Sequence, residues 1–179
     1  MMIKNNIAGL KKYLPNFLTF CNMTMGVTAI ILAAYEYYLL ASLFVMVGAV
    51  LDRYDGVIAR KFDITSELGK EMDSLADIIT FGVAPSIIAL LFPLSELKFK
   101  YLGYIITIIF VACGWYRLSR FNVSHFNNAY TGLPITIAGF LLALSLVYQS
   151  KYNVYPYSTA LIMLTFSYLM ISHHKIKKI

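Results

Sequence analysis

The stretch from Leu51 to Gly82 reads LDRYDGVIARKFDITSELGKEMDSLADIITFG and holds seven of the nine acidic residues of the chain. Long apolar segments flank it on both sides, so several of these carboxylates border or interrupt hydrophobic helices. A carboxylate at membrane depth costs about 2.5–3.5 kcal/mol on insertion scales, which makes each one a functional candidate. This stretch therefore decides both the fold class and the place of the site.

The first part of the stretch sets two carboxylates beside two very small residues. They stand at i, i+3, i+4 and i+7: Asp52, Asp55, Gly56 and Ala59. Residues at this spacing share one side of a helix. Such a face can hold a cation and still let a bulky ligand approach the backbone. Arg60 follows one turn beyond and is close enough to reach a phosphate group bound there.

The second part repeats this combination on the next helix. Gly69, Asp73 and Asp77 stand at i, i+4 and i+8, again along one face. The connection between the two helices, centred on residues 63–68, is short. The helices are therefore expected to be antiparallel neighbours whose acidic faces converge.

Four converging carboxylates would repel one another strongly without compensation. Divalent cations are the natural compensation, and an all-oxygen ligand set suits Mg²⁺, Mn²⁺ or Ca²⁺ rather than zinc. Mg²⁺ usually joins a few carboxylates to substrate phosphates, and two such ions about 3.5–4 Å apart clamp a phosphoryl group during transfer. The other acidic residues of the stretch are expected to be solvated: Asp63, Glu67 and Glu71.

The composition around this stretch is typical of a multi-span membrane protein. Of 179 residues, 59% are hydrophobic and 13% charged, with a mean hydropathy of +0.69, whereas a soluble domain carries about 25% charged residues. Six apolar segments are near the ~20 residues that a spanning helix needs: 14–35, 38–60, 71–93, 100–120, 132–149 and 155–172. Because backbone groups must be paired within lipid, and the segments are too long for barrel strands, an α-helical bundle follows.

The predicted fold class is thus an all-α integral membrane protein with six transmembrane helices in a single domain, 1–179. Residues 1–13 are basic and amphipathic and are expected to lie on the membrane surface as a helix. Residues 14–172 form the bundle and 173–179 a basic tail. No cleavable signal peptide is expected. Cys21 and Cys113 lie in apolar segments and are interpreted as packing residues, not as a disulfide.

The placement of lysine and arginine predicts the orientation of the bundle. With both termini inside, the inner side receives Lys4, Lys11, Lys12, Arg53, Arg60, Lys61, Lys70, Arg117, Arg120, Lys175, Lys177 and Lys178. The outer side receives only Lys98, Lys100 and Lys151. This excess predicts a cytoplasmic inner side. The net charge of +6 then reflects attraction to the anionic inner leaflet, and basic residues so scattered argue against nucleic-acid binding.

The acidic stretch resembles the signature of the CDP-alcohol phosphotransferase family, D-x2-D-G-x2-A-R-x8-G-x3-D-x3-D, at all eight fixed positions. The resemblance implies a six-helix membrane fold, usually a homodimer, with an active site open to the cytoplasm and two divalent cations, Mg²⁺ or Mn²⁺. It implies that Asp52, Asp55 and Asp73 hold the first ion, while Asp77 joins the second and acts as catalytic base. Further residues are implied to line the CDP-lipid site: Gly56, Ala59, Arg60, Ser66 and Gly69.

Other segments are similar to the serine-using branch of the family, the phosphatidylserine synthases of the small Gram-positive bacterial type. They are LPNFLTFCN (14–22), DSLADIITFGVAPS (73–86), YRLSRFN (116–122) and TGLPITIAG (131–139). This implies transfer of the phosphatidyl group from CDP-diacylglycerol to L-serine, with release of CMP, for phospholipid biosynthesis in the plasma membrane. Asn16 and Thr19 could hydrogen-bond the cytidine. The alternatives are a helix cap for Asn16 and a backbone-bonded hydroxyl for Thr19.

A serine acceptor brings a carboxylate into a site already rich in aspartate, so it needs a cation of its own. Arg117 and Arg120 stand at i, i+3 where the fourth apolar segment ends, and an arginine fork matches a carboxylate through two hydrogen bonds. Asn122, just beyond, could pair with the ammonium or carboxylate group. These residues form the predicted acceptor site. The alternative is that the arginines only anchor the span at the inner surface.

Several alternatives stay open at this point. Within the same chemistry, the acceptor could be glycerol phosphate or inositol phosphate, and the donor could be an archaeal lipid. A rival from another class is a cation channel or transporter with an acidic intramembrane site. A cation path has no need of an arginine beside small residues, so the combination of Gly56, Ala59, Arg60 and Gly69 favours the transferase.

Overall fold

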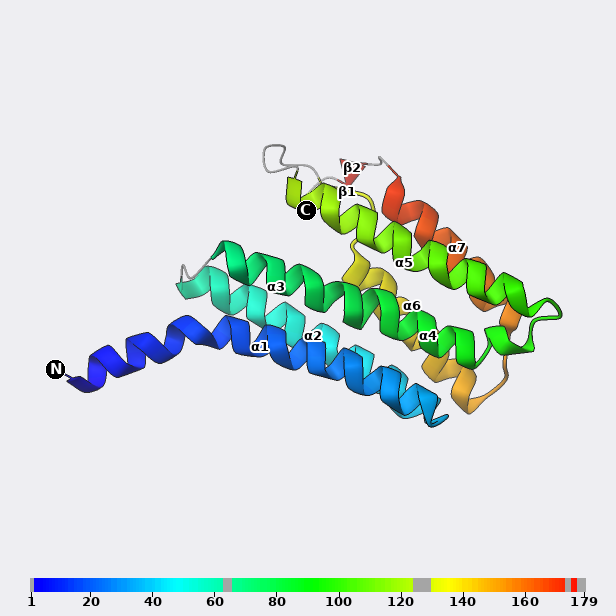
Figure 1. The fold of residues 1–179 in the computed structure, drawn as a ribbon, viewed down its shortest axis with the longest axis horizontal. Coiled ribbons are helices and arrows are strands. Elements are labelled where there is room, and N and C mark those ends of the chain that lie inside the picture. The colour runs from blue at the N-terminus through cyan, green and yellow to red at the C-terminus, as the bar shows by residue number, and fades with distance from the viewer. Residues whose placement is uncertain (1, 63–65, 124–129, 173–174, 177–179) are drawn as a thin grey trace.

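The computed structural model describes residues 2–62, 66–123, 130–172 and 175–176, with the backbone alone for 2–15, 59–62, 130–131 and 175–176. In chain order the elements are α1 (Met2–Ala34), α2 (Tyr38–Phe62), α3 (Glu67–Asp77), the π-helical η1 (Ile78–Val83), α4 (Ala84–Leu91), the 3₁₀ turn η2 (Leu94–Glu96), α5 (Lys100–Val123), β1 (Tyr130–Thr131), α6 (Ile135–Lys151), α7 (Pro156–Ile171) and β2 (Lys175–Ile176). The long helices run side by side along the long axis of the molecule (Figure 1).

Nearly all of the described chain is helical, which confirms the predicted helical class. The one departure among the described residues is the antiparallel pairing of the two-residue strands β1 and β2. This pairing joins the segment before α6 to the segment after α7, so it ties the ends of two bundle helices together.

Three described helical stretches are long and apolar enough to cross a membrane: Asn16–Ala34, Glu67–Leu91 and Lys100–Val123. The helices α6 and α7 are shorter and also apolar. The α2 helix matches the predicted 38–60 segment and carries several charged residues in its second half. These are the helices of a membrane protein, while the number of six spans stays a prediction.

The first helix differs from the expected arrangement in its continuity. The α1 helix runs without interruption from Met2 to Ala34, past the predicted boundary between a surface helix and the first span. Asn16 therefore lies in the interior of a helix, and the helix-cap alternative for this residue is wrong. The location of residues 1–13 on the membrane surface stays a prediction.

At the C-terminal end of α1, a residue in the left-handed backbone conformation stops the helix. Glu36 has a φ of 65°, and its N–H donates to the carbonyl of Ala33 at 3.0 Å. The N–H of Tyr37 donates to the carbonyl of Leu32 at 2.9 Å. This is the Schellman pattern, in which a residue with positive φ lets the chain pair the last carbonyls of a helix.

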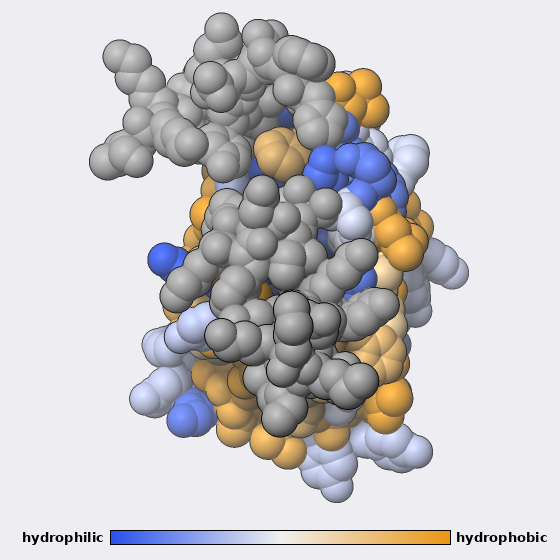
Figure 2. All heavy atoms as spheres, turned by 90° about the vertical axis from the view of Figure 1, so that its left-hand side faces the viewer, coloured by the Kyte–Doolittle hydropathy of each residue, from blue (hydrophilic) through white to orange (hydrophobic). Residues whose placement is uncertain are grey.

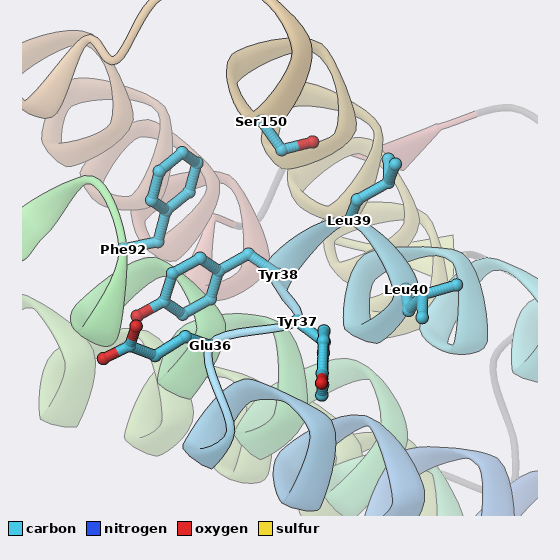
Figure 3. Close-up of a pocket in the computed structure, with 7 residues that line it drawn as sticks. All are labelled: Glu36, Tyr37, Tyr38, Leu39, Leu40, Phe92 and Ser150. Atoms are coloured by element: carbon cyan, nitrogen blue, oxygen red, sulfur yellow. The ribbon is translucent and has the colours of Figure 1, made fainter.

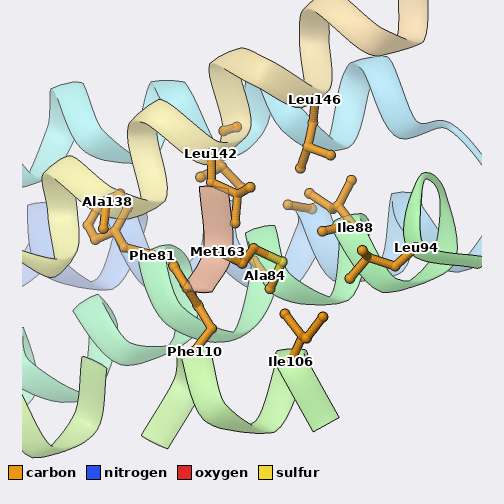
Figure 4. Packing of buried hydrophobic residues seen from close by; sticks show 14 of the residues in the cluster. Phe81, Ala84, Ile88, Leu94, Ile106, Phe110, Ala138, Leu142, Leu146 and Met163 are labelled. Carbon is orange, nitrogen blue, oxygen red and sulfur yellow. The ribbon is translucent and has the colours of Figure 1, made fainter. Parts of the chain in front are cut away.

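The rod formed by α3, η1 and α4 is the central element of the bundle. It contacts α1, α2, α5 and α6, while α1 also packs on α2 and α7 packs on α5. The largest buried side chains gather around η1 and α4 (Figure 4): Phe81, Ile88, Phe110, Leu142 and Met163. Burial of this kind fixes the rod along its length, and with it the acidic face at its beginning.

Two glycines let the rod approach its neighbours closely. A Cβ on Gly26 of α1 would lie 2.6 Å from Thr80 Oγ1, and a Cβ on Gly48 of α2 would lie 2.7 Å from Thr80 Cγ2. Small residues at helix contacts allow such approaches in membrane proteins. The Thr80 hydroxyl also donates to the carbonyl of Asn22 at 3.0 Å. Thr80 lies in η1, which begins directly after Asp77, the last residue of α3. These contacts therefore hold the π-helical turn that follows α3.

Candidate active site

The two acidic helix faces meet near the end of the bundle where α2 ends and α3 begins. Asp52 and Asp55 come from α2, and Asp73 and Asp77 from α3. Ligand oxygens of Asp52, Asp55 and Asp73 lie within 4.8 Å of one another, and Asp77 is in hydrogen-bond contact with Asp52. The structure thus brings the four predicted aspartates together, while the role of each stays a prediction.

Two of the four aspartates are buried, whereas Asp52 and Asp73 are half-buried. Asp55 is 3% exposed and Asp77 is 8% exposed. From α1, the hydroxyl of Thr19 donates to Asp55 Oδ2 at 3.1 Å. From α6, Thr136 is in hydrogen-bond contact with Asp52. Figure 2 views the molecule from this end, where hydrophilic side chains stand beside apolar ones.

Two oxygens of the cluster are left for a ligand. Asp73 Oδ1 and Asp77 Oδ1 are buried and have no hydrogen-bond partner among the described residues. A buried carboxylate oxygen without a partner destabilises the protein unless a ligand or ion satisfies it. An all-oxygen donor set is what Mg²⁺ and Mn²⁺ prefer. The residues present therefore fit a hard divalent cation.

Three residues predicted for the CDP-lipid site lie together at the start of α3. Ser66 is the N-cap of α3, and its Oγ accepts from the N–H of Gly69 at 3.0 Å. A Cβ on Gly69 would lie 3.0 Å from Ser66 Oγ and 3.2 Å from Asn16 Oδ1. The bare backbone of Gly69 is therefore edged by polar atoms from two helices, as a polar ligand requires.

The other residues predicted for that site are less fully described. Gly56 is half-buried, next in the chain to Asp55. Ala59 and Arg60 belong to α2, but their side chains lie outside the described residues. Of the acidic residues expected to be solvated, Asp63 also lies outside the described residues, while Glu67 and Glu71 are exposed.

The two arginines predicted for the acceptor site make contacts within their own end of the bundle. Arg117 is 7% exposed, with its guanidinium carbon 5.3 Å from the centre of the Phe121 ring. Arg120 Nη1 donates to the carbonyl of Ile171 at 3.2 Å. Ile171 is the last residue of α7, so this contact satisfies a carbonyl at a helix end. It favours a structural role for Arg120 beside the predicted one.

Asn122 connects α5 to α3 through a hydrogen bond. Its Nδ2 donates to Ser74 Oγ at 2.9 Å, and Ser74 directly follows Asp73. Sequence reasoning singled out Asn122 but missed Ser74, and it also missed Thr136 beside Asp52. A signal for Thr136 was present, because it lies in the segment TGLPITIAG. Its contact with Asp52 depends on how α6 packs against α2.

A cavity of about 340 Å³ lies at the other end of the bundle, beside the turn between α1 and α2 (Figure 3). Tyr38 and Phe92 stack there with ring centroids 4.8 Å apart, and the Tyr38 hydroxyl donates to the carbonyl of Leu91 at 3.3 Å. Glu36 is the one acidic residue that lines it. Without paired carboxylates, this cavity is not a second version of the acidic site.

The fold and the site define a class of protein: a helical membrane protein that can hold a hard metal ion in a partly buried acidic cluster. The family model described as CDP-alcohol phosphatidyltransferase matches residues 12–175. The chain belongs to this family, and the resemblance of the acidic stretch to it is confirmed.

Relatives within the family carry related names. The chain is 38% identical to a CDP-diacylglycerol–serine O-phosphatidyltransferase of Bacillus subtilis, over 91% of this chain and 89% of the relative. It is 35% identical to the enzyme of the same name from Helicobacter pylori, over 87% of this chain and 66% of the relative. It is also 37% identical to an archaetidylserine synthase of Methanothermobacter thermautotrophicus, over 89% of this chain and 67% of the relative.

Proposed function

We propose that the protein is a phosphatidylserine synthase, which transfers the phosphatidyl group of CDP-diacylglycerol to L-serine and releases CMP. The observation that carries this proposal is the acidic cluster, with ligand oxygens of three aspartates within 4.8 Å of one another. The relatives that share most of the chain supply the substrate class, since their names specify a CDP-lipid donor and serine.

The cluster would hold two divalent cations, Mg²⁺ or Mn²⁺. In this proposal Asp52, Asp55 and Asp73 hold the first ion, and Asp77 contributes to the second. The unpartnered oxygens of Asp73 and Asp77 support this assignment. Bound there, such ions would compensate the negative charge of the donor pyrophosphate and of the departing CMP.

The cytidine end of the donor would lie over the start of α3. Its site would be formed by Asn16, Thr19, Gly56, Ala59, Arg60, Ser66 and Gly69. The short distances from the Gly69 position to the oxygens of Asn16 and Ser66 support this placement. Thr19 joins the nucleotide end to the acidic cluster, because its hydroxyl already donates to Asp55. Arg60 would pair with a phosphate oxygen.

The transfer itself forms one bond and breaks one. The serine hydroxyl oxygen bonds to the phosphorus that carries diacylglycerol, and the bond from this phosphorus to the CMP oxygen breaks. The hydroxyl proton goes to Asp77, which acts as general base. Because Asp77 is held in a buried cluster, its carboxylate is positioned before the substrate arrives, and positioning of this kind contributes much of the rate.

The acceptor would bind where α5 ends. Arg117 and Arg120 would pair with the serine carboxylate, and Asn122 with its carboxylate or ammonium group. The hydrogen bond from Asn122 to Ser74 supports this location, since Ser74 is adjacent to Asp73. Arg120 would then serve two purposes, because it also donates to the carbonyl of Ile171.

The same proposal includes the setting of the enzyme. The chain would cross the plasma membrane six times, with both termini and the acidic cluster on the cytoplasmic side, and would work as a homodimer. The excess of lysine and arginine at the expected inner side supports this orientation. Both substrates, and the lipid product, would then meet at the cytoplasmic leaflet.

The test is turnover by the purified protein in detergent with Mg²⁺ or Mn²⁺. CDP-diacylglycerol is offered with serine, glycerol phosphate or inositol phosphate, and CMP and the lipid product are measured. Serine is expected to be preferred. Preference for another alcohol would overturn the acceptor assignment and keep the transferase. If no alcohol releases CMP from a CDP-lipid, the transferase is wrong, and metal flux into liposomes would favour a channel or transporter.

An archaeal donor is the second candidate for the lipid, because one relative is named archaetidylserine synthase. A CDP-activated isoprenoid ether lipid, tested beside CDP-diacylglycerol under the same conditions, separates the two. A higher kcat/KM with the ether lipid would replace the proposed donor and leave the rest of the mechanism unchanged.

A further inference from the structure

A buried amide lies about one helical turn further into the bundle than the acidic cluster. Asn22 of α1 is 0% exposed. Neither its Oδ1 nor its Nδ2 has a hydrogen-bond partner in the part of the chain that the structure describes. An amide buried in this way destabilises the fold, and an internal water is the usual group that satisfies it. Asn22 is therefore a candidate for binding a small polar ligand inside the protein.

Contacts of α1 place Asn22 close to Asp77 along the axis of the bundle. In α1, Asn22 follows Thr19 by three residues, and Thr19 donates to Asp55. The Thr80 hydroxyl donates to the Asn22 carbonyl at 3.0 Å, and Thr80 follows Asp77 by three residues. Three residues of a helix rise roughly 4.5 Å. Two consecutive hydrogen bonds through one water span about that distance.

The amide also points toward the cluster. Side chains of a helix lean toward its N-terminus, so Asn22 leans toward the level of Thr19 in α1. On the facing helix α2, a Cβ at Gly48 would lie 3.0 Å from Asn22 Oδ1. Gly48 precedes Asp52 by four residues, and Asp52 leans back toward the level of Gly48 for the same reason. The amide and the carboxylates therefore approach each other between α1 and α2.

We propose that one buried water joins Asn22 to Asp77. A single water satisfies both atoms of a primary amide, because it accepts from the Nδ2 hydrogen and donates one of its own hydrogens to Oδ1. Its second hydrogen goes to Asp77 Oδ1, which is also buried without a partner among the residues described. The water then makes three hydrogen bonds, the usual number for an internal water.

This water makes Asn22 a positioning residue for Asp77. The inference rests on the proposed function, in which Asp77 contributes to a metal site and acts as base. Carboxylates that bind metals are themselves hydrogen-bonded, and those outer partners fix their orientation. A carboxylate oxygen has more than one lone pair, so Asp77 Oδ1 can accept from the water and still face an ion. Asn22 itself touches no substrate, because it is fully buried.

A purely structural role explains Asn22 less well. A buried amide that holds helices together bonds to a neighbouring helix, as Gln149 of α6 does when its Nε2 donates to Thr159 Oγ1 of α7 at 2.9 Å. The Asn22 side chain makes no such bond to the described residues. The contact of Asn22 with the rod comes from its backbone carbonyl, which any residue would supply. Its amide is therefore available to the water.

The first test locates the water directly. A structure of the full chain with Mg²⁺, at a resolution that shows ordered waters, should show one water within about 3.2 Å of Asn22 Oδ1, Asn22 Nδ2 and Asp77 Oδ1. An Asn22 amide that contacts only protein atoms would overturn the proposal. A water that contacts Asn22 and lies out of reach of Asp77 would overturn it as well.

The second test compares Asn22→Ala with Asn22→Ser. The two side chains leave similar space, but only serine keeps a hydroxyl that can hold the water. Asn22→Ala should lower kcat about 10–100-fold, the usual loss when an outer partner of a metal ligand is removed. The KM values for donor and serine should change much less. Asn22→Ser should lose much less of kcat than Asn22→Ala.

The same order is expected in a measurement without turnover. Mg²⁺ that binds the folded protein raises its unfolding temperature. The Mg²⁺ concentration that gives half of this rise should increase about tenfold or more in Asn22→Ala, and it should stay near the wild-type value in Asn22→Ser. Ser42→Ala is the control, because Ser42 is fully buried in α2 and its hydroxyl donates to the Tyr38 carbonyl of the same helix. It should change neither kcat nor this concentration.

The variants also separate failure of this inference from failure of the proposed function. Equal losses in Asn22→Ala and Asn22→Ser would mean that the size of the side chain matters and its hydrogen bonding does not. Wild-type values in Asn22→Ala would mean that the amide has no effect on Asp77. Either result contradicts the inference and leaves the transferase in place. If the wild-type protein releases no CMP with any acceptor, the proposed function fails, and the positioning role of Asn22 fails with it.

Discussion

The two ends of the bundle differ in whether their buried polar atoms have hydrogen-bond partners. At the end with the α6–α7 turn, Gln149 is buried and both polar atoms of its side chain have hydrogen-bond partners. Its Nε2 donates to Thr159 Oγ1 at 2.9 Å, and its Oε1 accepts from the N–H of Tyr155 at 2.9 Å. At the other end, Asp73 Oδ1 and Asp77 Oδ1 are buried and lack a hydrogen-bond partner within the described part of the chain.

The difference separates structure from function. A buried amide whose donor and acceptor are both satisfied stabilises the fold, because it replaces the hydrogen bonds it made to water. A buried carboxylate oxygen without a partner costs stability, and a protein keeps such a group where a ligand will meet it. The acidic end is therefore expected to respond to metal and substrate, and the other end to respond only in stability.

The largest effect is expected when divalent metal is removed. Excess chelator should abolish CMP release, and added Mg²⁺ or Mn²⁺ should restore it, because the carboxylates otherwise repel the donor phosphates. Asp52→Ala and Asp73→Ala should lose metal-dependent donor binding, measured by titration with CDP-diacylglycerol. Glu71→Ala is the control, since Glu71 is an exposed carboxylate on the same helix as Asp73. Full activity in chelator would refute the two-metal assignment.

The next effect is expected for the general base. Asp77→Asn keeps the shape of the side chain and removes its ability to take a proton, so turnover should fall by about 10²–10⁴-fold. Donor binding should be largely retained, because the other three aspartates remain. Single-turnover rates and donor titration measure the two properties separately. A variant that keeps more than about a tenth of the wild-type rate would sink the assignment of Asp77 as base.

A smaller effect is expected at the acceptor. Arg120→Lys should raise the serine KM about tenfold, a loss of roughly 1.4 kcal/mol, because a lysine cannot make the paired contact. The donor KM and kcat should change much less. Arg117→Lys should act in the same direction, to a similar or lesser degree. If the serine KM is unchanged in both variants, the serine carboxylate binds elsewhere, and the role of Arg120 is structural, as its contact with Ile171 favours.

The sequence predicted the acidic site better than the surroundings of that site. Spacing along a helix is a local property, so it was enough to place Asp52 with Asp55, and Asp73 with Asp77, on two faces. The partners from distant helices depend on packing that no spacing encodes. Thr136 reaches Asp52 from α6, and Ser74 receives a hydrogen bond from Asn122 of α5.

The same reason explains the differences in the helices. Apolar content located the segments, but it does not show where a helix continues through polar residues. The α1 helix therefore joins the helix predicted for residues 1–13 to the first predicted span without a break. Nor does the sequence pattern reveal the π-helical turn Ile78–Val83, in which Thr80 lies against two glycines of other helices.

At the end of the bundle with the α6–α7 turn, a substitution should affect stability and leave activity unchanged. Gln149→Leu removes the hydrogen bonds of the amide with Thr159 and Tyr155 and leaves the N–H of Tyr155 without this partner, so the free energy of unfolding should fall by about 1–3 kcal/mol. Thermal unfolding in detergent measures the loss. The KM values for donor and serine should be unchanged. Ser145→Ala is the control, because the Ser145 hydroxyl bonds only within its own helix in the described contacts. A changed serine KM in Gln149→Leu would contradict the separation of the two ends.

The smallest effect is expected at Glu36, where a substitution should raise the stability of the protein and not lower it. This residue has a φ of 65°, which a residue with a Cβ adopts at a cost and glycine does not. Glu36→Gly should therefore raise the free energy of unfolding by up to about 1 kcal/mol. The gain is reduced by any favourable contact of the carboxylate, whose side chain points toward the Tyr38 hydroxyl (Figure 3). Glu36→Ala separates the two contributions, because it removes the carboxylate and keeps the Cβ.

A higher unfolding temperature in Glu36→Gly than in Glu36→Ala, with equal kcat and KM in both, is the expected result. Equal unfolding temperatures would mean that the turn tolerates a Cβ at this φ without cost, as a Schellman turn can when neighbouring contacts over-determine it. Loss of turnover in both variants would be the more serious contradiction. It would mean that the end remote from the aspartates contributes to chemistry, and that satisfied polar groups are no guide to where function lies.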